Sequence, residues 1–183
     1  MAKPHAQSGF TLLEIIIVLA ILAISAAILA PSIRDWLPSY QINGAARELF
    51  SNMQKAKSEA VKLNTNIGIS FETVVFPATG GSYTAFVDDG SGGGTAGNAV
   101  QDGTESFLFK VEMPTSCSLI SASFRATKNT GYNSRGLVLG NRIGTAIIRN
   151  TRNRWQKMTL SNSGYPKLQV STDTTDGTDG TWN

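Results

Sequence analysis

The sequence has a single histidine, His5, and a single cysteine, Cys117. One cysteine cannot form an internal disulfide, and in a strand-rich region its usual role is that of a small buried side chain. Histidine is the commonest general base and metal ligand, and His5 lies within the first nine residues. Because no paired carboxylates stand in a recognisable frame either, the sequence predicts no enzyme activity and no cofactor.

The chain also has little net charge. Its formal charge is +3, and charged residues make up 16% of its 183 residues. This mildly basic balance gives no general electrostatic reason to expect nucleic acid as a partner. Once an apolar N-terminal stretch is set aside, roughly 150 residues remain, which is enough for one domain with a sizeable core.

The most prominent feature is an apolar run from Phe10 to Ala30, in which the only clearly polar residues are Thr11, Glu14 and Ser25. As a helix it is roughly 30 Å long, about the thickness of a hydrocarbon core, so it predicts a membrane-spanning helix. Glu14 lies one turn inside this run. A charged side chain there costs on the order of 2.5–3.5 kcal/mol on insertion scales, so we expect Glu14 to have a partner.

The N-terminal motif Gly9-Phe10-Thr11-Leu12-Leu13-Glu14, behind a short leader and ahead of an apolar helix, resembles the class III signal of type IV pilins and type II secretion pseudopilins. The resemblance implies that a prepilin peptidase cleaves between Gly9 and Phe10 and methylates the new amine of Phe10. It also implies that Glu14 serves assembly. Pro31 takes the position where these families often have a helix-kinking proline.

Two other interpretations of the N-terminus remain open. An ordinary secretory signal is cut after its apolar region at small residues, and Ala23-Ile24-Ser25-Ala26 could imitate such a site. A plain signal-anchor helix is the second. Both leave Glu14 unexplained, because neither gains anything from a carboxylate.

Beyond Pro38 the pattern becomes amphipathic. Small and apolar residues recur at alternating spacings of four and three, which places them on one face of a helix. These residues are Ile42, Ala46, Leu49, Met53, Ala56, Ala60 and Leu63. The sequence therefore predicts a second helical segment over residues 31–66, with one face against a core.

From residue 67 onward, short β-branched and aromatic runs alternate with turn residues. The predicted strands are Ile67–Phe76, Tyr83–Val87, Phe107–Glu112, Leu119–Arg125, Gly136–Leu139, Thr145–Arg149, Lys157–Leu160 and Lys167–Val170. A glycine-rich stretch from Asp89 to Ser106 predicts a mobile surface loop. The predicted fold class is α+β, with antiparallel sheets packed against the N-terminal helix as in pilins.

A second resemblance lies in the helix-to-strand region, in Ala45-Ala46-Arg47-Glu48-Leu49 and Ala56-Lys57-Ser58-Glu59-Ala60, and later in Tyr132-Asn133-Ser134-Arg135-Gly136. It is similar to the domain shared by the H-type minor pseudopilin of type II secretion and related fimbrial minor pilins. The implied organisation is a leader (1–9), a transmembrane and filament-core helix (10–30), an amphipathic helix (31–66), a periplasmic β-rich domain (67–172) and a polar acidic tail (173–183).

The resemblance implies a minor pseudopilin in the bacterial inner membrane, single-pass, with its C-terminal domain in the periplasm. Its expected partners are other pseudopilins, the prepilin peptidase and N-methyltransferase, and the inner-membrane assembly platform. The alternative is a minor pilin of a type IV pilus that primes assembly or takes up DNA. Fimbrial relatives that capture DNA have a Gly-Arg-x-Arg motif, whereas this chain has Gly164-Tyr165-Pro166-Lys167.

Two weaker candidate sites lie near the C-terminus. Arg149, Arg152 and Arg154 surround Trp155 in a basic run that also includes Arg142 and Lys157, and such a run could hold phosphates with a base stacked on the indole. A solvated hairpin is the preferred interpretation, so nucleic acid is an unlikely partner. Three aspartates in the tail are weak candidates for calcium ligands: Asp173, Asp176 and Asp179. The preferred interpretation is a polar tail without a metal site.

Overall fold

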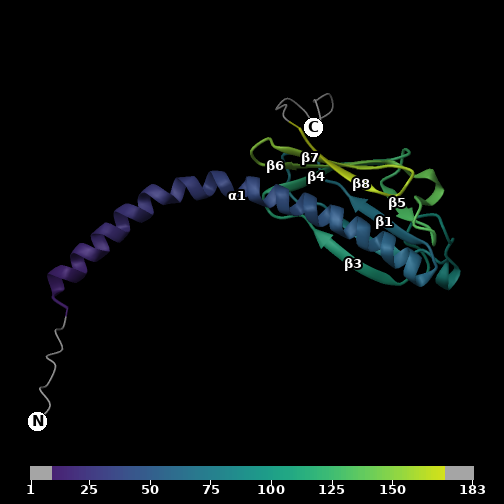
Figure 1. The fold of residues 1–183 in the computed structure, drawn as a ribbon, viewed down its shortest axis with the longest axis horizontal. Coiled ribbons are helices and arrows are strands. Elements are labelled where there is room, and N and C mark those ends of the chain that lie inside the picture. Colours follow the sequence, from purple (N-terminus) through teal and green to yellow (C-terminus); the bar gives the residue numbers. More distant parts are fainter. Residues whose placement is uncertain (1–9, 172–183) are drawn as a thin grey trace, which may run out of the picture. The chain divides into compact units, whose positions relative to one another are not determined.

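The computed structural model describes residues 10–171, without the side chains of residues 30–33 and 35. Within this range the chain forms one α-helix, eight strands and two short 3₁₀ helices (Figure 1). It divides into two compact units, residues 1–37 and residues 38–183, and helix α1 (Leu12–Leu63) contributes to both. The strands are β1 (Ile67–Glu72), β2 (Ser82–Val87), β3 (Phe107–Glu112), β4 (Cys117–Phe124), β5 (Asn129–Tyr132), β6 (Gly144–Asn150), β7 (Trp155–Leu160) and β8 (Pro166–Ser171).

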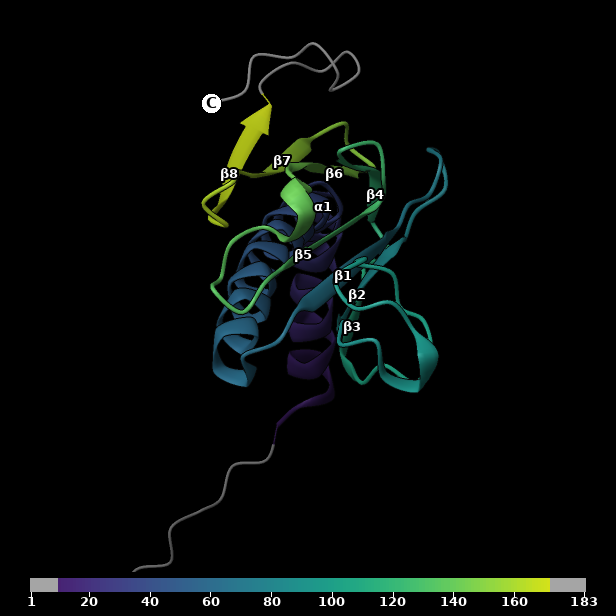
Figure 2. The ribbon, with the colours of Figure 1, turned by 90° about the vertical axis from the view of Figure 1, so that its right-hand side faces the viewer.

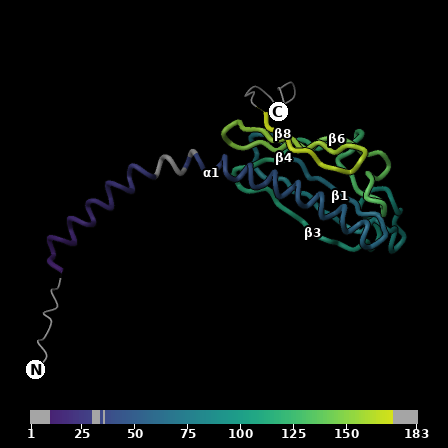
Figure 3. Tube along the Cα trace, in the orientation of Figure 1, coloured from purple at the N-terminus to yellow at the C-terminus, as the bar shows by residue number. Residues whose placement is uncertain are grey.

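Helix α1 is helical from end to end, Pro31 and Pro38 included. The two predicted segments, 10–30 and 31–66, therefore belong to one element, which ends at Leu63 rather than at residue 66. The side chain of Pro31 lies outside the described residues, in the stretch drawn in grey within the helix in Figure 3, so the kink at Pro31 stays a prediction.

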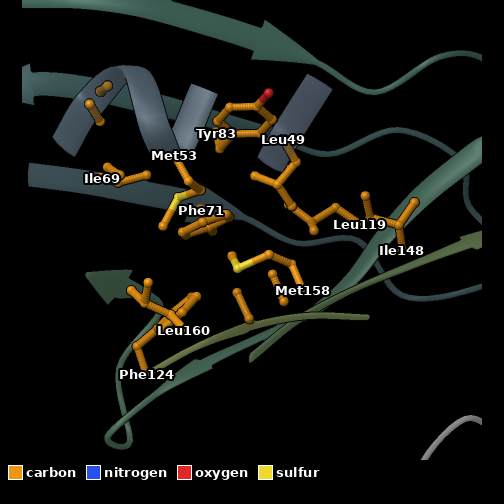
Figure 4. Close-up of a cluster of buried hydrophobic side chains, with 14 of the residues drawn as sticks. Leu49, Met53, Ile69, Phe71, Tyr83, Leu119, Phe124, Ile148, Met158 and Leu160 are labelled. Carbon is orange, nitrogen blue, oxygen red and sulfur yellow. The ribbon is translucent and has the colours of Figure 1, made fainter. Parts of the chain in front are cut away.

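The apolar stripe of α1 enters the core of the second unit. Six of its seven predicted members are buried, from Ile42 to Ala60, whereas Leu63 at the helix end is 47% exposed. Figure 4 shows Leu49 and Met53 facing Phe71 and Tyr83 of the sheet. Because burial of this stripe removes apolar surface from water, packing stabilises this part of the helix in the core.

Two antiparallel four-stranded sheets cover the helix (Figure 2). The first has the strand order β3-β2-β1-β5, and the second has the order β4-β6-β7-β8. Side chains of both sheets meet in the core, where the rings of Phe71 and Phe124 stack at 5.1 Å between centroids. The predicted α+β class with antiparallel sheets on the helix is confirmed.

One predicted strand is wrong. Residues Gly136–Leu139 form a turn that leads into a 3₁₀ helix (Leu139–Asn141), and the fourth strand of the first sheet is the preceding segment, β5. In β5, Gly131 pairs with Gly68 of β1, and a Cβ at Gly131 would collide with the carbonyl oxygen of Ile67. Two facing glycines thus allow close backbone approach, which hydrophobic patterning alone does not reveal.

The glycine-rich segment after β2, predicted to be a mobile surface loop, is a loop that internal hydrogen bonds hold together. The carboxylate of Asp88, fully buried, accepts hydrogen bonds from the backbone N–H groups of Gly97 and Ala99, both at 2.7 Å. The carboxylate of Glu105, also buried, accepts from the N–H groups of Gly90 at 3.0 Å and Asp102 at 3.2 Å. Two carboxylates therefore fasten the loop to the end of β2.

Candidate assembly site

The assembly candidate Glu14 lies in the first turn of α1, and Thr11 caps that turn. The N–H of Glu14 donates to the Thr11 hydroxyl at 3.2 Å, and the N–H of Ile15 donates to the Thr11 carbonyl at 3.3 Å. A carboxylate in the first turn also interacts favourably with the positive end of the helix dipole. The geometry therefore fixes where the Glu14 side chain leaves the helix.

The sequence analysis missed this cap. Thr11 and Glu14 stand in the Ser/Thr-x-x-Glu spacing of a capping box, just ahead of an apolar run, and that spacing is the signal that identifies Thr11. Half of the box is formed, since the Thr11 oxygen accepts from the N–H of Glu14. Capping is thus a second reason for a glutamate at this position, beside assembly.

The helix around Glu14 is not covered by protein. Residues Leu12–Leu29 have a mean hydropathy of 3.0, and none of them is buried. By length and composition this is the one stretch of the described residues able to cross a membrane. Within residues 10–171, no ion pair involves Glu14. Its carboxylate is therefore placed among apolar side chains that face outward.

Several predicted sites lie outside the described residues. Gly9, on the leader side of the predicted cleavage, is one of them, while Phe10 on the other side is described and is 78% exposed. The three tail aspartates, Asp173, Asp176 and Asp179, are also outside. Among the residues that are described, no group of three His, Cys, Asp or Glu side chains is placed to hold a metal ion.

The basic run, a weak candidate for nucleic-acid contact, has its central aromatic ring buried. The indole of Trp155 is 4% exposed, and the Arg149 guanidinium carbon lies 4.6 Å from its ring centroid. The same guanidinium carbon lies 3.5 Å from the ring centroid of Phe76. A base therefore cannot stack on Trp155 in this arrangement. Arg142 lies before β6, at the far end of the strand from Arg149, where it donates to the Thr127 hydroxyl at 3.0 Å.

Cys117 begins β4 and is fully buried. Burial raises the pKa of its thiol, and a weaker effect of the Ser116 hydroxyl opposes this. Because the thiolate is the reactive form, we expect native Cys117 to react with Ellman's reagent at least about tenfold more slowly than in urea. Equal rates in the folded and unfolded protein would contradict the buried position.

Comparison with known proteins agrees with these features. Residues 45–164 match the family described as type II transport protein GspH, and residues 4–30 match the prokaryotic N-terminal methylation motif. Because the first match covers more than half of the chain, the chain belongs to the GspH family of type II transport proteins. The resemblance to H-type minor pseudopilins inferred from the sequence is thereby confirmed.

Two solved structures are similar in fold. The minor pseudopilin EpsH from the type 2 secretion system of Vibrio cholerae is 13% identical, with a TM-score of 0.46 over 71% of this chain and 97% of EpsH. The type IV minor pilin FimU of Pseudomonas aeruginosa is 19% identical, with a TM-score of 0.47 over 73% of this chain and 99% of FimU. At these values neither likeness carries a functional argument. No curated protein matches the sequence.

Membership in this family has two direct implications. A chain with the N-terminal methylation motif is processed by a prepilin peptidase, and a pseudopilin assembles with other pseudopilins. The uncovered apolar helix and the compact second unit correspond to a membrane anchor that carries a soluble C-terminal domain.

Proposed function

We propose that this GspH-family chain is a minor pseudopilin of a type II secretion system, a structural subunit of the pseudopilus that drives export of folded proteins across the outer membrane. The observation that carries this proposal is the match over residues 45–164 to a type II transport family. The chain is anchored in the bacterial inner membrane by α1, with the second unit in the periplasm. It also contacts the inner-membrane assembly platform.

Assembly depends on Glu14 and on an amine that processing creates. Cleavage between Gly9 and Phe10 leaves a positive amine one turn ahead of Glu14, at the end of an uncovered apolar helix. The capped first turn supports this role because it holds Glu14 at a defined position near that amine. Pairing between the amine of one subunit and Glu14 of its neighbour leaves neither charge alone in an apolar surrounding. Methylation keeps the charge on the amine, so the pair survives it.

The processing step is tested by mass spectrometry of the protein purified from membranes. We expect a first residue Phe10 with one added methyl group on its amine. A Gly9→Leu variant is the control, and it should keep residues 1–9 because the peptidase requires the small residue. A mature product that begins anywhere else would overturn the assembly site as described.

The alternative is a minor pilin of a type IV pilus, because both systems use the same leader and helix. Co-purification distinguishes them. A pseudopilin is recovered with major and minor pseudopilins and fails to secrete cargo when deleted, whereas a pilin is recovered with pilus subunits and its deletion reduces piliation or DNA uptake. The missing arginine pair at Gly164–Lys167 argues against the DNA-uptake variant.

A further inference from the structure

Three loops of the second unit meet around a small hollow that the assembly role does not use. Its volume is about 270 Å³, and it is lined by Gly97, Arg125, Thr127, Gly140 and Arg142. Gly97 comes from the loop between β2 and β3. The turn between β4 and β5 contributes Arg125 and Thr127, and the 3₁₀ helix before β6, with its C-cap, contributes the other two. The charged side chains among these five residues are thus two guanidinium groups.

Arg142 is held on both sides by hydrogen bonds of its own backbone. Its N–H donates to the carbonyl of Leu139 at 3.0 Å. Its carbonyl accepts from the hydroxyl of Thr130, a fully buried residue, at 2.8 Å. The side chain is held as well, because Nη1 donates to the Thr127 hydroxyl at 3.0 Å. These contacts fix where the Arg142 guanidinium lies beside the hollow.

Arg125 has a backbone conformation that disfavours arginine. The backbones of Phe124 and Thr127 close a two-residue turn with N–H···O bonds in both directions, at 2.8 and 3.2 Å. The central residues, Arg125 and Ala126, have φ angles of 49° and 67°, both positive as in a type I′ turn, which favours asparagine and glycine. The Arg125 side chain extends to the 3₁₀ helix, where Nη1 donates to the carbonyl of Gly140 at 3.3 Å. An arginine at a strained position indicates a role for its side chain beyond forming the turn.

The charges around the hollow favour a particular class of ligand. Within residues 10–171, no ion pair involves Arg125 or Arg142, and neither guanidinium donates a further hydrogen bond. One carboxylate lies behind the lining, since the N–H of Gly97 donates to buried Asp88 at 2.7 Å. Two guanidinium groups and this carboxylate leave a net of one positive charge, which a single carboxylate neutralises. A phosphate monoester carries about −1.5 to −2 charges and would exceed it.

We propose that this hollow binds one carboxylate group, held between the guanidinium groups of Arg125 and Arg142. Each guanidinium presents a planar fork of N–H groups that matches the two oxygens of a carboxylate. Two sources supply this chemistry, a small free carboxylate and an acidic side chain of another protein, and the experiment separates them. Nucleic acid is disfavoured because no aromatic side chain lines the hollow for a base to stack on. The proposal does not depend on Glu14 or on the secretion system.

The first test is a titration of isotope-labelled full-length protein in uncharged detergent micelles at low salt, followed by amide NMR. The probes are sodium acetate and two blocked tripeptides, acetyl-Gly-Glu-Gly-amide and acetyl-Gly-Gln-Gly-amide. We expect acetate and the glutamate peptide to shift the amide signals of Gly97 and Gly140 until they saturate. The glutamine peptide should leave these signals unchanged, and equal shifts from it would overturn the proposal. Tighter binding of the glutamate peptide than of acetate assigns the site to a protein side chain, and the reverse order assigns it to a free carboxylate.

Substitution of the two arginines tests whether their guanidinium groups carry the binding. Arg125→Gln with Arg142→Gln should weaken acetate binding tenfold or more, since a hydrogen bond to a charged group contributes on the order of tenfold in affinity. Arg47→Gln with Arg154→Gln is the matched control, because it removes the same charge from exposed residues outside the hollow. The control should bind as the unaltered protein does. Equal losses from the two pairs would reduce binding to net charge and overturn the proposal.

A variant of the β4–β5 turn separates binding from folding. Arg125→Asn with Ala126→Gly introduces the residues that a type I′ turn prefers, so the melting temperature should stay equal or rise. Acetate binding should nevertheless fall on the order of tenfold, because one of the two guanidinium groups is gone. Ala126→Gly alone keeps both groups and should bind normally. Unchanged binding in the double variant would overturn the proposal, and a lower melting temperature would contradict the strain at Arg125.

Two competitors test the class of anion. Inorganic phosphate should bind no more tightly than acetate at equal ionic strength, and short duplex DNA should not displace the glutamate peptide. Tighter binding of phosphate that requires Arg125 and Arg142 would overturn the assignment to a carboxylate. Displacement by DNA that requires the same two residues would show that nucleic acid is the ligand instead.

Discussion

Replacing Glu14 by alanine should leave the protein in the membrane but remove it from the filament. The apolar helix is unchanged, so membrane fractionation of Glu14→Ala should match that of the wild type. Without the carboxylate, the amine of a neighbouring subunit is left unpaired in an apolar surrounding, which costs about 3–5 kcal/mol in buried pairs. We therefore expect co-purification with partner pseudopilins to fall by two orders of magnitude or more.

Two variants separate pairing from helix capping, the second reason found for Glu14. Glu14→Gln keeps the side-chain shape and the capping preference but removes the charge, so it should fail like Glu14→Ala. Thr11→Ala removes the cap at a cost of about 1 kcal/mol and keeps the charge, so it should still assemble. Normal assembly of Glu14→Gln would show that Glu14 serves the helix start rather than the filament.

Removal of the Asp88 carboxylate should strongly destabilise the second unit. Asp88→Ala leaves the N–H groups of Gly97 and Ala99 without their acceptors, and each orphaned buried donor costs about 1–3 kcal/mol. We expect a loss of roughly 2–5 kcal/mol in the free energy of unfolding. Hydrogen exchange of the full-length protein in detergent should show faster exchange in the peptide that contains these two amides.

Asp89 is the matched control for this experiment. It adjoins Asp88, and its carboxylate accepts hydrogen bonds from the backbone N–H and the hydroxyl of Ser91 at the exposed surface of the loop. Hydrogen bonds from Ser91 lower the pKa of Asp89, so the carboxylate is ionised at neutral pH. Asp89→Ala should leave the free energy of unfolding close to that of the unaltered protein. Equal losses from the two substitutions would contradict an anchoring role for Asp88.

Strongly periodic features of the sequence predicted the structure well. The apolar run and the stripe from Ile42 to Ala60 follow the two patterns that a helix requires, one apolar on all sides and one on a single face. The strand Phe107–Glu112 has the predicted bounds. These features were predicted because the spacing of apolar residues along a helix or a strand can be read directly from the sequence.

The features that the sequence did not predict have a common physical origin. They depend on close backbone contacts or on residues that lie far apart along the chain. Strand β5 depends on Gly131 facing Gly68, and the loop after β2 depends on Asp88 reaching residues nine and eleven positions away. The Arg149 contact with Phe76 joins segments from different sheets. None of these pairings has a local pattern, so only the folded chain brings their members together. Thr11 is different, since its capping spacing was present in the sequence.

The uncovered helix also bears on how such a fibre is built and taken apart. Lipid tails are as apolar as leucine. A helix that moves from the bilayer into a bundle of neighbouring helices therefore gains almost no free energy from the hydrophobic effect. The balance between the two surroundings is then decided by close side-chain fit and by a few polar contacts. Exchange of a subunit between the bilayer and the bundle is therefore controlled by these contacts and not by the apolar length of the helix.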